Sequence, residues 1–323
     1  MVKQLKICLA FLRLIRLPNL VIIAITQYFM RWFILKPLLS VSDFKVQLNT
    51  LQFSLLVLST VLIAAAGYII NDYFDRKTDL INRPGRVIVG RLIKRRYAMA
   101  FHIVFSILGI LAGTYLAYSI HRLSLGIVFI FATVVLWFYS TTYKRQVVIG
   151  NLIISMLVGF VPLMVLLFEF PLLVKRYELY ILASGVNFSY LIFWVVSYTI
   201  FAFIVNLIRE IIKDMEDFEG DYVFGRQTIP IAWGLQIAKW IVIGLIVTMI
   251  VPIVYLLIKH LSDKISFVYI VLFIIVPLIM LAFGVSWAST KKQYHILSQA
   301  SKFIMLSGLI YCPLVNYIIS AYK

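Results

Sequence analysis

The chain has 323 residues, of which 63% are hydrophobic and only 13% are charged. Soluble domains carry about 25% charged residues, so this composition excludes an ordinary soluble domain and favours a membrane protein. The net charge of +17 could suggest a nucleic-acid-binding protein. The basic residues, however, are distributed in the way that orients proteins in a lipid bilayer, so we expect no nucleic-acid partner.

Nine apolar segments are long enough to cross a bilayer as helices, which takes about 17–25 residues each. They occupy residues 19–40, 51–71, 97–120, 123–142, 147–168, 190–208, 235–258, 266–287 and 303–321. The first segment is the weakest, because Arg31 and Lys36 interrupt it. The sequence therefore predicts an all-α integral membrane protein, a bundle of nine transmembrane helices that forms one domain over residues 1–323.

The basic residues on the two sides of these segments indicate an orientation. With the N-terminus in the cytoplasm, the cytoplasmic segments hold about 20 of the 30 Lys and Arg residues and the opposite side holds about 8. Such an excess of cytoplasmic positive charge is typical of multi-pass proteins. We therefore expect a multi-pass protein of the cell (inner) membrane, with its N-terminus in the cytoplasm and its C-terminus on the opposite side.

The scarce acidic residues are concentrated in two places. Nine of the 13 Asp and Glu residues lie within residues 72–79 or residues 210–221, each directly after an apolar segment. Three aspartates in each place have the same spacing: Asp72, Asp75 and Asp79 in motif one (residues 71–79), and Asp214, Asp217 and Asp221 in motif two (residues 214–221). The count of spans puts both motifs on the cytoplasmic side. The repeated spacing indicates a weak internal duplication with a period of four helices.

Residues at i, i+3 and i+7 share one helical face, so each motif would place three like charges side by side. A hard cation would stabilise such a face, and Mg²⁺ binds carboxylates together with substrate phosphates. Two such motifs at the cytoplasmic mouth of a bundle would hold Mg²⁺ around a diphosphate and stabilise its charge as it leaves. We therefore expect all six aspartates to be catalytic, and the metal ligands to be Asp72, Asp75, Asp214 and Asp217.

Neighbouring polar residues are candidates for substrate contacts, and several have a plainer alternative. Diphosphate or phosphate binding is expected of Asn71, Arg83, Arg86, Lys144, Lys213 and Arg226. Asn71 could instead cap neighbouring backbone, and Lys144 could be an orientation anchor. Contacts with the acceptor or with an allylic cation are expected of Arg16, Asn19, Tyr68 and Tyr139, although snorkelling, capping and interfacial packing would also explain them. Glu216 and Glu219 fall outside the shared spacing and are expected to face solvent.

The two motifs resemble those of a known family. "NDYFDRKTD" (71–79) and "DMEDFEGD" (214–221) look like the paired aspartate motifs of the UbiA-type intramembrane prenyltransferases. The resemblance covers most of the chain, from "IRLPN" (15–19) through "YSTTYKR" (139–145) and "GN" (150–151) to "RQTIPI" (226–231). It implies nine helices, Mg²⁺ as cofactor, an isoprenyl diphosphate donor and a lipophilic acceptor.

Within that superfamily, "NDYFDRKTDLINRPGR" (71–86) and "REIIKDMEDFEGD" (209–221) look most like digeranylgeranylglyceryl phosphate synthases. This likeness implies transfer of a geranylgeranyl group to the free hydroxyl of a prenylated glycerol phosphate, which gives an ether lipid. The chain departs from the pattern at "VIVGR" (87–91), which replaces a Pro-Ile-Pro-Ser-Gly pattern, and at Gln227, which replaces a usual basic residue. Both departures bear on the identity of the acceptor more than on the class of reaction.

Two other functions would use similar residues. An aromatic prenyltransferase of quinone or haem biosynthesis would apply the same donor chemistry to a ring carbon. An ion-coupled membrane transporter would also use carboxylates and internal repeats. Transporters, however, place such charges near the midplane of the membrane, whereas these carboxylates follow the ends of apolar segments.

Overall fold

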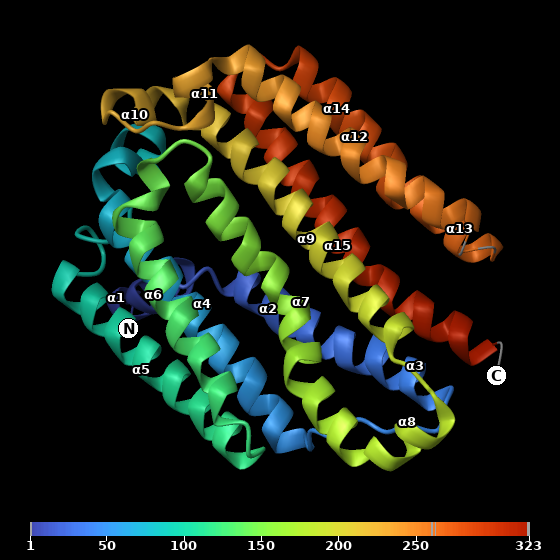
Figure 1. Cartoon of the computed structure of the whole chain (residues 1–323). Coiled ribbons are helices and arrows are strands. Elements are labelled where there is room, and N and C mark those ends of the chain that lie inside the picture. The colour runs from blue at the N-terminus through green and yellow to red at the C-terminus, as the bar shows by residue number, and fades with distance from the viewer. Residues whose placement is uncertain (1, 260, 262, 322–323) are drawn as a thin grey trace. The chain divides into compact units, whose positions relative to one another are not determined.

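The computed structural model describes residues 2–259, 261 and 263–321, which are almost entirely helical. Within these ranges, nine helical stretches are long and apolar enough to cross a membrane (Figure 1). They are Leu17–Ser40, Thr50–Asn82, Arg95–Ser119, Leu123–Thr141, Ile149–Arg176, Ser189–Glu216, Leu235–Lys259, Lys264–Trp287 and Lys291–Ala321. The predicted all-α fold with nine membrane spans is thus confirmed.

Backbone packing divides the chain into two compact units. Unit 1 comprises residues 1–28, 46–144 and 164–187, and unit 2 comprises residues 29–45, 145–163 and 188–323. Motif one therefore belongs to unit 1 and motif two to unit 2. The single domain expected over residues 1–323 stays a prediction.

Unit 1 is built around the long helix that carries motif one. Its helices are α1 (Val2–Leu14), α2 (Leu17–Phe29), α4 (Thr50–Asn82), η2 (Pro84–Arg86), α5 (Arg95–Ser119), η3 (Leu123–Gly126), α6 (Ile127–Thr141) and α8 (Glu178–Ser184), with the second half of α7 (Ile149–Arg176). Helix α4 packs lengthwise against α5, and Ser59 Oγ donates a hydrogen bond of 2.6 Å to the carbonyl of Gly109. A Cβ on Gly109 would lie 2.7 Å from Ile63 Cγ1, so this close approach of the two helices requires glycine.

The start of α4 is held by side chains that replace missing helical hydrogen bonds. The side chain of Asn49 accepts from the backbone N–H of Gln52, and the side chain of Gln52 accepts from that of Asn49, which forms a capping box. Just before this capping box in the sequence, the backbone N–H groups of Gln47 and Leu48 donate to the side chain of Glu169, which is fully buried. The end of α4 that lies farthest from motif one is therefore well fixed.

Unit 2 is built around the helix that carries the first part of motif two. Its helices are η1 (Met30–Leu35), α3 (Lys36–Ser40), the first half of α7, α9 (Ser189–Glu216), α10 (Phe218–Val223), α11 (Ile229–Trp233), α12 (Leu235–Lys259), α13 (Lys264–Ile270), η5 (Val271–Ile275), α14 (Val276–Trp287) and α15 (Lys291–Ala321). The short helix η4 (Tyr143–Arg145) contains one of the points at which the chain passes from unit 1 to unit 2. Helices α9 and α15 run side by side (Figure 1). Their contact is close enough that a Cβ on Gly308 would meet the ring of Phe201 at 2.3 Å.

Among the residues that the structure describes, two spans contain a π-helical segment, and each segment ends two residues before a proline. Segment η1 precedes Pro37, and η5 precedes Pro277. Because proline lacks an N–H and crowds the preceding turn, a wider turn accommodates the change in hydrogen bonding. In η1 this turn is closed by the backbone N–H of Lys36, which donates to the carbonyl of Arg31. The side chain of Arg31 is buried in this turn, at 7% exposure, although the sequence showed it as an interruption of the span.

Several helices continue beyond the predicted ends of their apolar segments. Helix α4 reaches Asn82, α9 reaches Glu216, and α15 already begins at Lys291. Extending an existing helix adds a hydrogen bond per residue and does not require apolar side chains. The polar stretches expected to connect the spans are therefore partly helical.

Candidate active site

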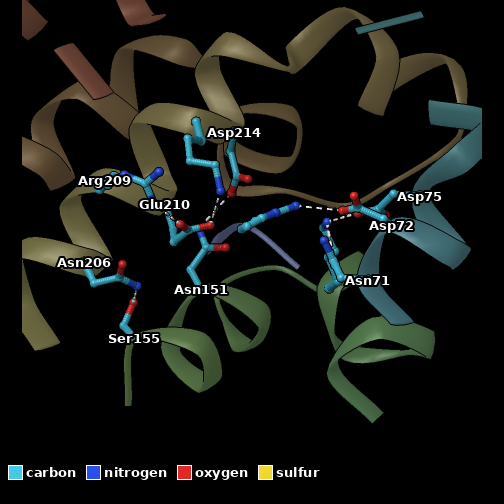
Figure 2. A network of polar contacts seen from close by, with 12 residues as sticks. Asn71, Asp72, Asp75, Asn151, Ser155, Asn206, Arg209, Glu210 and Asp214 are labelled. Atoms are coloured by element: carbon cyan, nitrogen blue, oxygen red, sulfur yellow. Dashed lines mark hydrogen bonds and ion pairs between the residues drawn. The ribbon is translucent and has the colours of Figure 1, made fainter. Parts of the chain in front are cut away.

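Motif one lies within the uninterrupted helix α4, so its three aspartates share one face as the spacing predicts. Asp75 is buried at 5% exposure, and Asp72 and Asp79 are half-buried. Figure 2 shows Asn71, Asp72 and Asp75 grouped on this helix. Carboxylates in such positions need compensating cations, because burial of an unpaired charge is costly.

Arg16 compensates Asp72. Its Nη2 lies 2.8 Å from Asp72 Oδ1, and its guanidinium carbon lies 4.9 Å from the centroid of the Tyr68 ring. Burial lowers the pKa of Arg16, but Asp72 and Tyr68 raise it, so the net pKa lies above its ordinary value and the group stays charged.

Arg16 forms the corner between α1 and α2 with a φ of 51°, a left-handed conformation that costs about 1–2 kcal/mol outside glycine. The adjacent Ile15 is buried in a cluster with Val89, which anchors this corner.

Lys144 compensates Asp75. Its Nζ donates a 3.0 Å hydrogen bond to Asn71 Oδ1 and forms an ion pair with Asp75 Oδ2. The side-chain oxygen of Asn71 therefore accepts from Lys144 instead of capping backbone. Lys144 is turned inward toward the motif, which an orientation anchor at the membrane surface would not require.

The remaining residues predicted around motif one are less engaged with it. The side chain of Asp79 forms no hydrogen bond or ion pair within the ranges that the structure describes, and its backbone carbonyl accepts from the N–H of Arg83 at 2.8 Å. Tyr139 is buried at 8% exposure, and Asn19 lies in the first turn of α2. The side chain of Arg86 lies outside the described part of the chain.

Motif two crosses a kink, which corrects the expectation of one uninterrupted helical face. Helix α9 ends at Glu216 and α10 begins at Phe218, and Asp217 stands between them with φ −94° and ψ 10°. The i to i+4 hydrogen bonds still continue, since the N–H of Asp217 donates to Lys213 at 2.8 Å and that of Asp221 donates to Asp217 at 3.1 Å. The spacing of the aspartates is therefore kept across the junction, but with irregular geometry at Asp217.

Asp214 is held from the neighbouring helix α7. Asn151 Nδ2 donates a 2.7 Å hydrogen bond to Asp214 Oδ2 (Figure 2). Four residues further along α7 and eight residues back along α9, Asn206 Nδ2 donates a 3.2 Å bond to Ser155 Oγ, and both residues are buried. These two polar contacts join the described parts of α7 and α9, and the first of them touches a motif aspartate.

Glu210 extends the acidic face of α9 by one turn before Asp214. It is buried and accepts from Arg209 Nη1 at 2.9 Å and from Lys213 Nζ at 2.7 Å (Figure 2). Lys213, which the sequence suggested for phosphate, is therefore paired with Glu210 in this structure. Sequence reasoning did not assign Glu210 to the site, although its spacing of four residues from Asp214 was a usable signal.

Asp221 and Arg226 are buried together, at 3% and 8% exposure. Arg226 Nη1 lies 3.4 Å from Asp221 Oδ1, and the backbone N–H of Arg226 donates to the carbonyl of Asp221 at 3.0 Å. The next N–H, that of Gln227, donates to the carbonyl of Arg145 at 3.1 Å. The segment after α10 is therefore tied to the turn that precedes α7.

The expectation for Glu216 is wrong, and that for Glu219 is confirmed. Glu216 is buried at 7% exposure and its Oε1 lies 3.0 Å from His295 Nδ1 on α15, whereas Glu219 is exposed. Because α9 packs lengthwise against α15, the side of α9 that carries Glu216 faces a helix instead of solvent. His295 had no ligand spacing in the sequence that would have identified it.

The carboxylates of each motif, taken separately, fit Mg²⁺ shared with a substrate. Among the described residues, no three His, Cys, Asp or Glu side chains are arranged to enclose a metal ion by themselves. Mg²⁺ needs no such cage, because it binds one or two carboxylates and takes its other ligands from water and phosphate. Asp72 and Asp214 each accept one nitrogen donor on a single oxygen, which leaves the other oxygen without a described protein partner.

Residues 42–306 match the family model of the UbiA prenyltransferase family, and the chain belongs to that family. Among curated relatives, digeranylgeranylglyceryl phosphate synthase of Methanopyrus kandleri is 33% identical over 256 residues, which cover 77% of this chain and 81% of that protein. The synthase of Methanothermobacter thermautotrophicus is 35% identical over 210 residues, which cover 64% of this chain and 66% of that protein. The family and these relatives indicate a prenyltransferase.

Solved structures support the fold. One, described as digeranylgeranylglyceryl phosphate synthase, has a TM-score of 0.60 and 24% identity, and covers 96% of this chain and 99% of its own. A UbiA homologue from Archaeoglobus fulgidus bound to DMAPP and Mg²⁺ has a TM-score of 0.59 and 16% identity, and covers 94% of this chain and 98% of its own. At these identities, the likeness establishes a shared helical architecture.

Proposed function

We propose that the chain catalyses Mg²⁺-dependent transfer of a geranylgeranyl group from its diphosphate to the free hydroxyl of a prenylated glycerol phosphate. The observation that carries this proposal is the pair of equally spaced aspartate motifs, in a chain whose curated relatives are named digeranylgeranylglyceryl phosphate synthases. That both motifs act on one diphosphate, with Asp72, Asp75, Asp214 and Asp217 as metal ligands, rests on the repeated spacing and on the family.

The ion pairs around motif one suggest how the donor is received. Without substrate, Arg16 and Lys144 neutralise Asp72 and Asp75. Mg²⁺ held by Asp72 and Asp75 would supply positive charge that stabilises the departing diphosphate. Arg16 and Lys144 would then donate to phosphate oxygens in place of Asp72 and Asp75, so that no charge is left uncompensated.

The reaction is a substitution at the first carbon of the donor. The bond from this carbon to the diphosphate oxygen breaks, and its electron pair leaves with the diphosphate. The allylic cation is attacked by the acceptor's hydroxyl oxygen, which forms the ether bond and releases one proton to a carboxylate or to the departing diphosphate. Tyr68, whose ring already faces the Arg16 cation, is suited to stabilise the allylic cation at short range.

The acceptor brings a phosphate of its own, which requires further cations. Arg83, Arg86, Lys213 and Arg226 are the basic residues predicted to bind phosphate that have not been assigned to the donor, and we assign the acceptor phosphate to this group. The prenyl chains of both substrates would stay in apolar surroundings while their head groups meet at the aspartates. An aromatic acceptor without a phosphate would not need this additional positive charge.

Product analysis tests the proposal. The purified protein is given geranylgeranyl diphosphate, Mg²⁺ and a mixture of geranylgeranylglyceryl phosphate, hydroxybenzoate and dihydroxynaphthoate, and the products are identified by mass spectrometry. We expect the diether phosphate and no prenylated ring. Prenylation of a ring carbon with an untouched glycerol lipid would support the aromatic prenyltransferase instead. No product of either kind, together with ion-driven uptake into vesicles, would support the transporter.

A further inference from the structure

We propose that Asn151 is a positioning residue, which holds Asp214 so that one carboxylate oxygen faces the Mg²⁺ diphosphate. This inference rests on the proposed function, because it assumes that Asp214 binds the metal. It adds a second helix, α7, to the residues that prepare motif two for its ligand.

The hydrogen bond itself has the geometry that such a role requires. The amide nitrogen of Asn151 lies 2.7 Å from Asp214 Oδ2, and it is the only described side chain that bonds to this carboxylate. An amide N–H cannot bind a cation, so it restricts the Asp214 side chain without competing for the metal. The other oxygen, Oδ1, is left for the ligand. Partners of this kind orient metal ligands and contribute strongly to metal affinity.

The turn before Asn151 shows that its position is enforced. Val148 has a φ of 67°, a left-handed conformation that is a genuine outlier for a β-branched residue. Such strain persists only where the surroundings determine the backbone. Here the carbonyl of Arg145 accepts from the N–H of Gln227, which ties the turn to the segment that follows motif two. The turn therefore places the first residues of α7, including Asn151, relative to motif two.

A second contact between the same two helices supplies a matched control. Asn206 bonds to Ser155 at 3.2 Å, four residues further along α7 and eight residues before Asp214 on α9. Both residues are buried and neither touches a carboxylate. Loss of the Ser155 hydroxyl removes a contact between α7 and α9 but leaves the bond to Asp214 in place.

The test compares Asn151→Ala, Asn151→Leu and Ser155→Ala with the wild-type chain, all purified at full length. Binding of inorganic pyrophosphate is measured by calorimetry as a function of Mg²⁺ concentration, and the melting temperature is recorded without ligand. We expect both Asn151 variants to need about 10–100-fold more Mg²⁺ for half-maximal binding, and Ser155→Ala to stay within about twofold of wild type. Asn151→Leu keeps the side-chain volume, so it tests the loss of the donor should the alanine variant fold poorly.

Each outcome separates the two proposals. A wild-type-like Mg²⁺ requirement in the Asn151 variants would overturn the positioning role while leaving the proposed function intact. Equal losses in the Asn151 and Ser155 variants would also overturn it, because they would indicate general helix packing. If the wild-type chain binds pyrophosphate without any dependence on Mg²⁺, the proposed function fails and this inference fails with it.

Discussion

At the scale of single residues, the acidic side chains of this membrane protein differ in what neutralises them. Asp72 has Arg16, Asp75 has Lys144 and Asp221 has Arg226. Asp214 instead accepts from a neutral amide. Within the described chain, the Asp214 carboxylate therefore has a neutral hydrogen-bond partner, which suits a ligand that brings positive charge.

Replacing a metal-binding aspartate should remove most of the activity. We expect Asp72→Asn and Asp214→Asn each to lower kcat/KM by at least about 100-fold, because each loses several kcal/mol of charge stabilisation and 1.36 kcal/mol corresponds to a factor of about ten. Glu219→Gln is the matched control, since this exposed residue follows the same helix end without the shared spacing. The measurement is steady-state turnover at saturating Mg²⁺, and equal losses at Glu219 and Asp214 would contradict the assignment.

At the scale of helices, close approach depends on small residues and on contacts far apart in sequence. Gly109 lets α5 approach α4 near Ser59, and Gly308 lets α15 approach α9. The bond between Glu216 and His295 fixes the end of α9, directly before the kink at Asp217. The conformation of motif two is therefore set in part by α15, which contributes no acidic residue to it.

The packing of α4 on α5 leads to a stability prediction. Gly109→Ala should destabilise the protein by about 1–3 kcal/mol, because the new methyl group would overlap Ile63. Gly244→Ala is the control: no atom lies within 4 Å of its added Cβ, and replacing a glycine inside a helix stabilises it by roughly 0.5–1 kcal/mol. Melting temperatures in detergent would show the difference, and similar values for the two variants would contradict the close approach of α4 and α5.

At the scale of the whole molecule, the charge asymmetry leads us to propose a cytoplasmic N-terminus and a site that opens to the cytoplasm. Both motifs end spans that run in the same direction by the count of helices. The polar diphosphate group of the donor would then reach the aspartates from the cytoplasmic side, while the prenyl chains enter from the lipid.

Labelling of single cysteines tests this orientation. Cys8 and Cys312 are first replaced, and a single cysteine is then introduced at one of three exposed positions. Leu92 (54% exposed) follows motif one, and Val223 (65% exposed) is the last residue of α10. Leu179 (83% exposed) is the control for the opposite side of the membrane. A maleimide that cannot cross the membrane should label the first two only in inside-out vesicles and the third only in intact cells. Labelling of positions 92 and 223 from different sides would rule out a common cytoplasmic site.

The sequence by itself determined the nine spans, the two aspartate motifs and the family, because hydropathy and spacing are local properties of the chain. Helix ends were less predictable: α4 and α9 continue through polar residues that carry no apolar signal. Only the tertiary structure decided which partner each acidic residue has. The bond from Arg16 to Asp72 spans 56 positions, that from Asn151 to Asp214 spans 63, and that from His295 to Glu216 spans 79. Such pairings depend on how distant helices pack, and a local pattern at Glu216 could not show that its outer side is covered by α15.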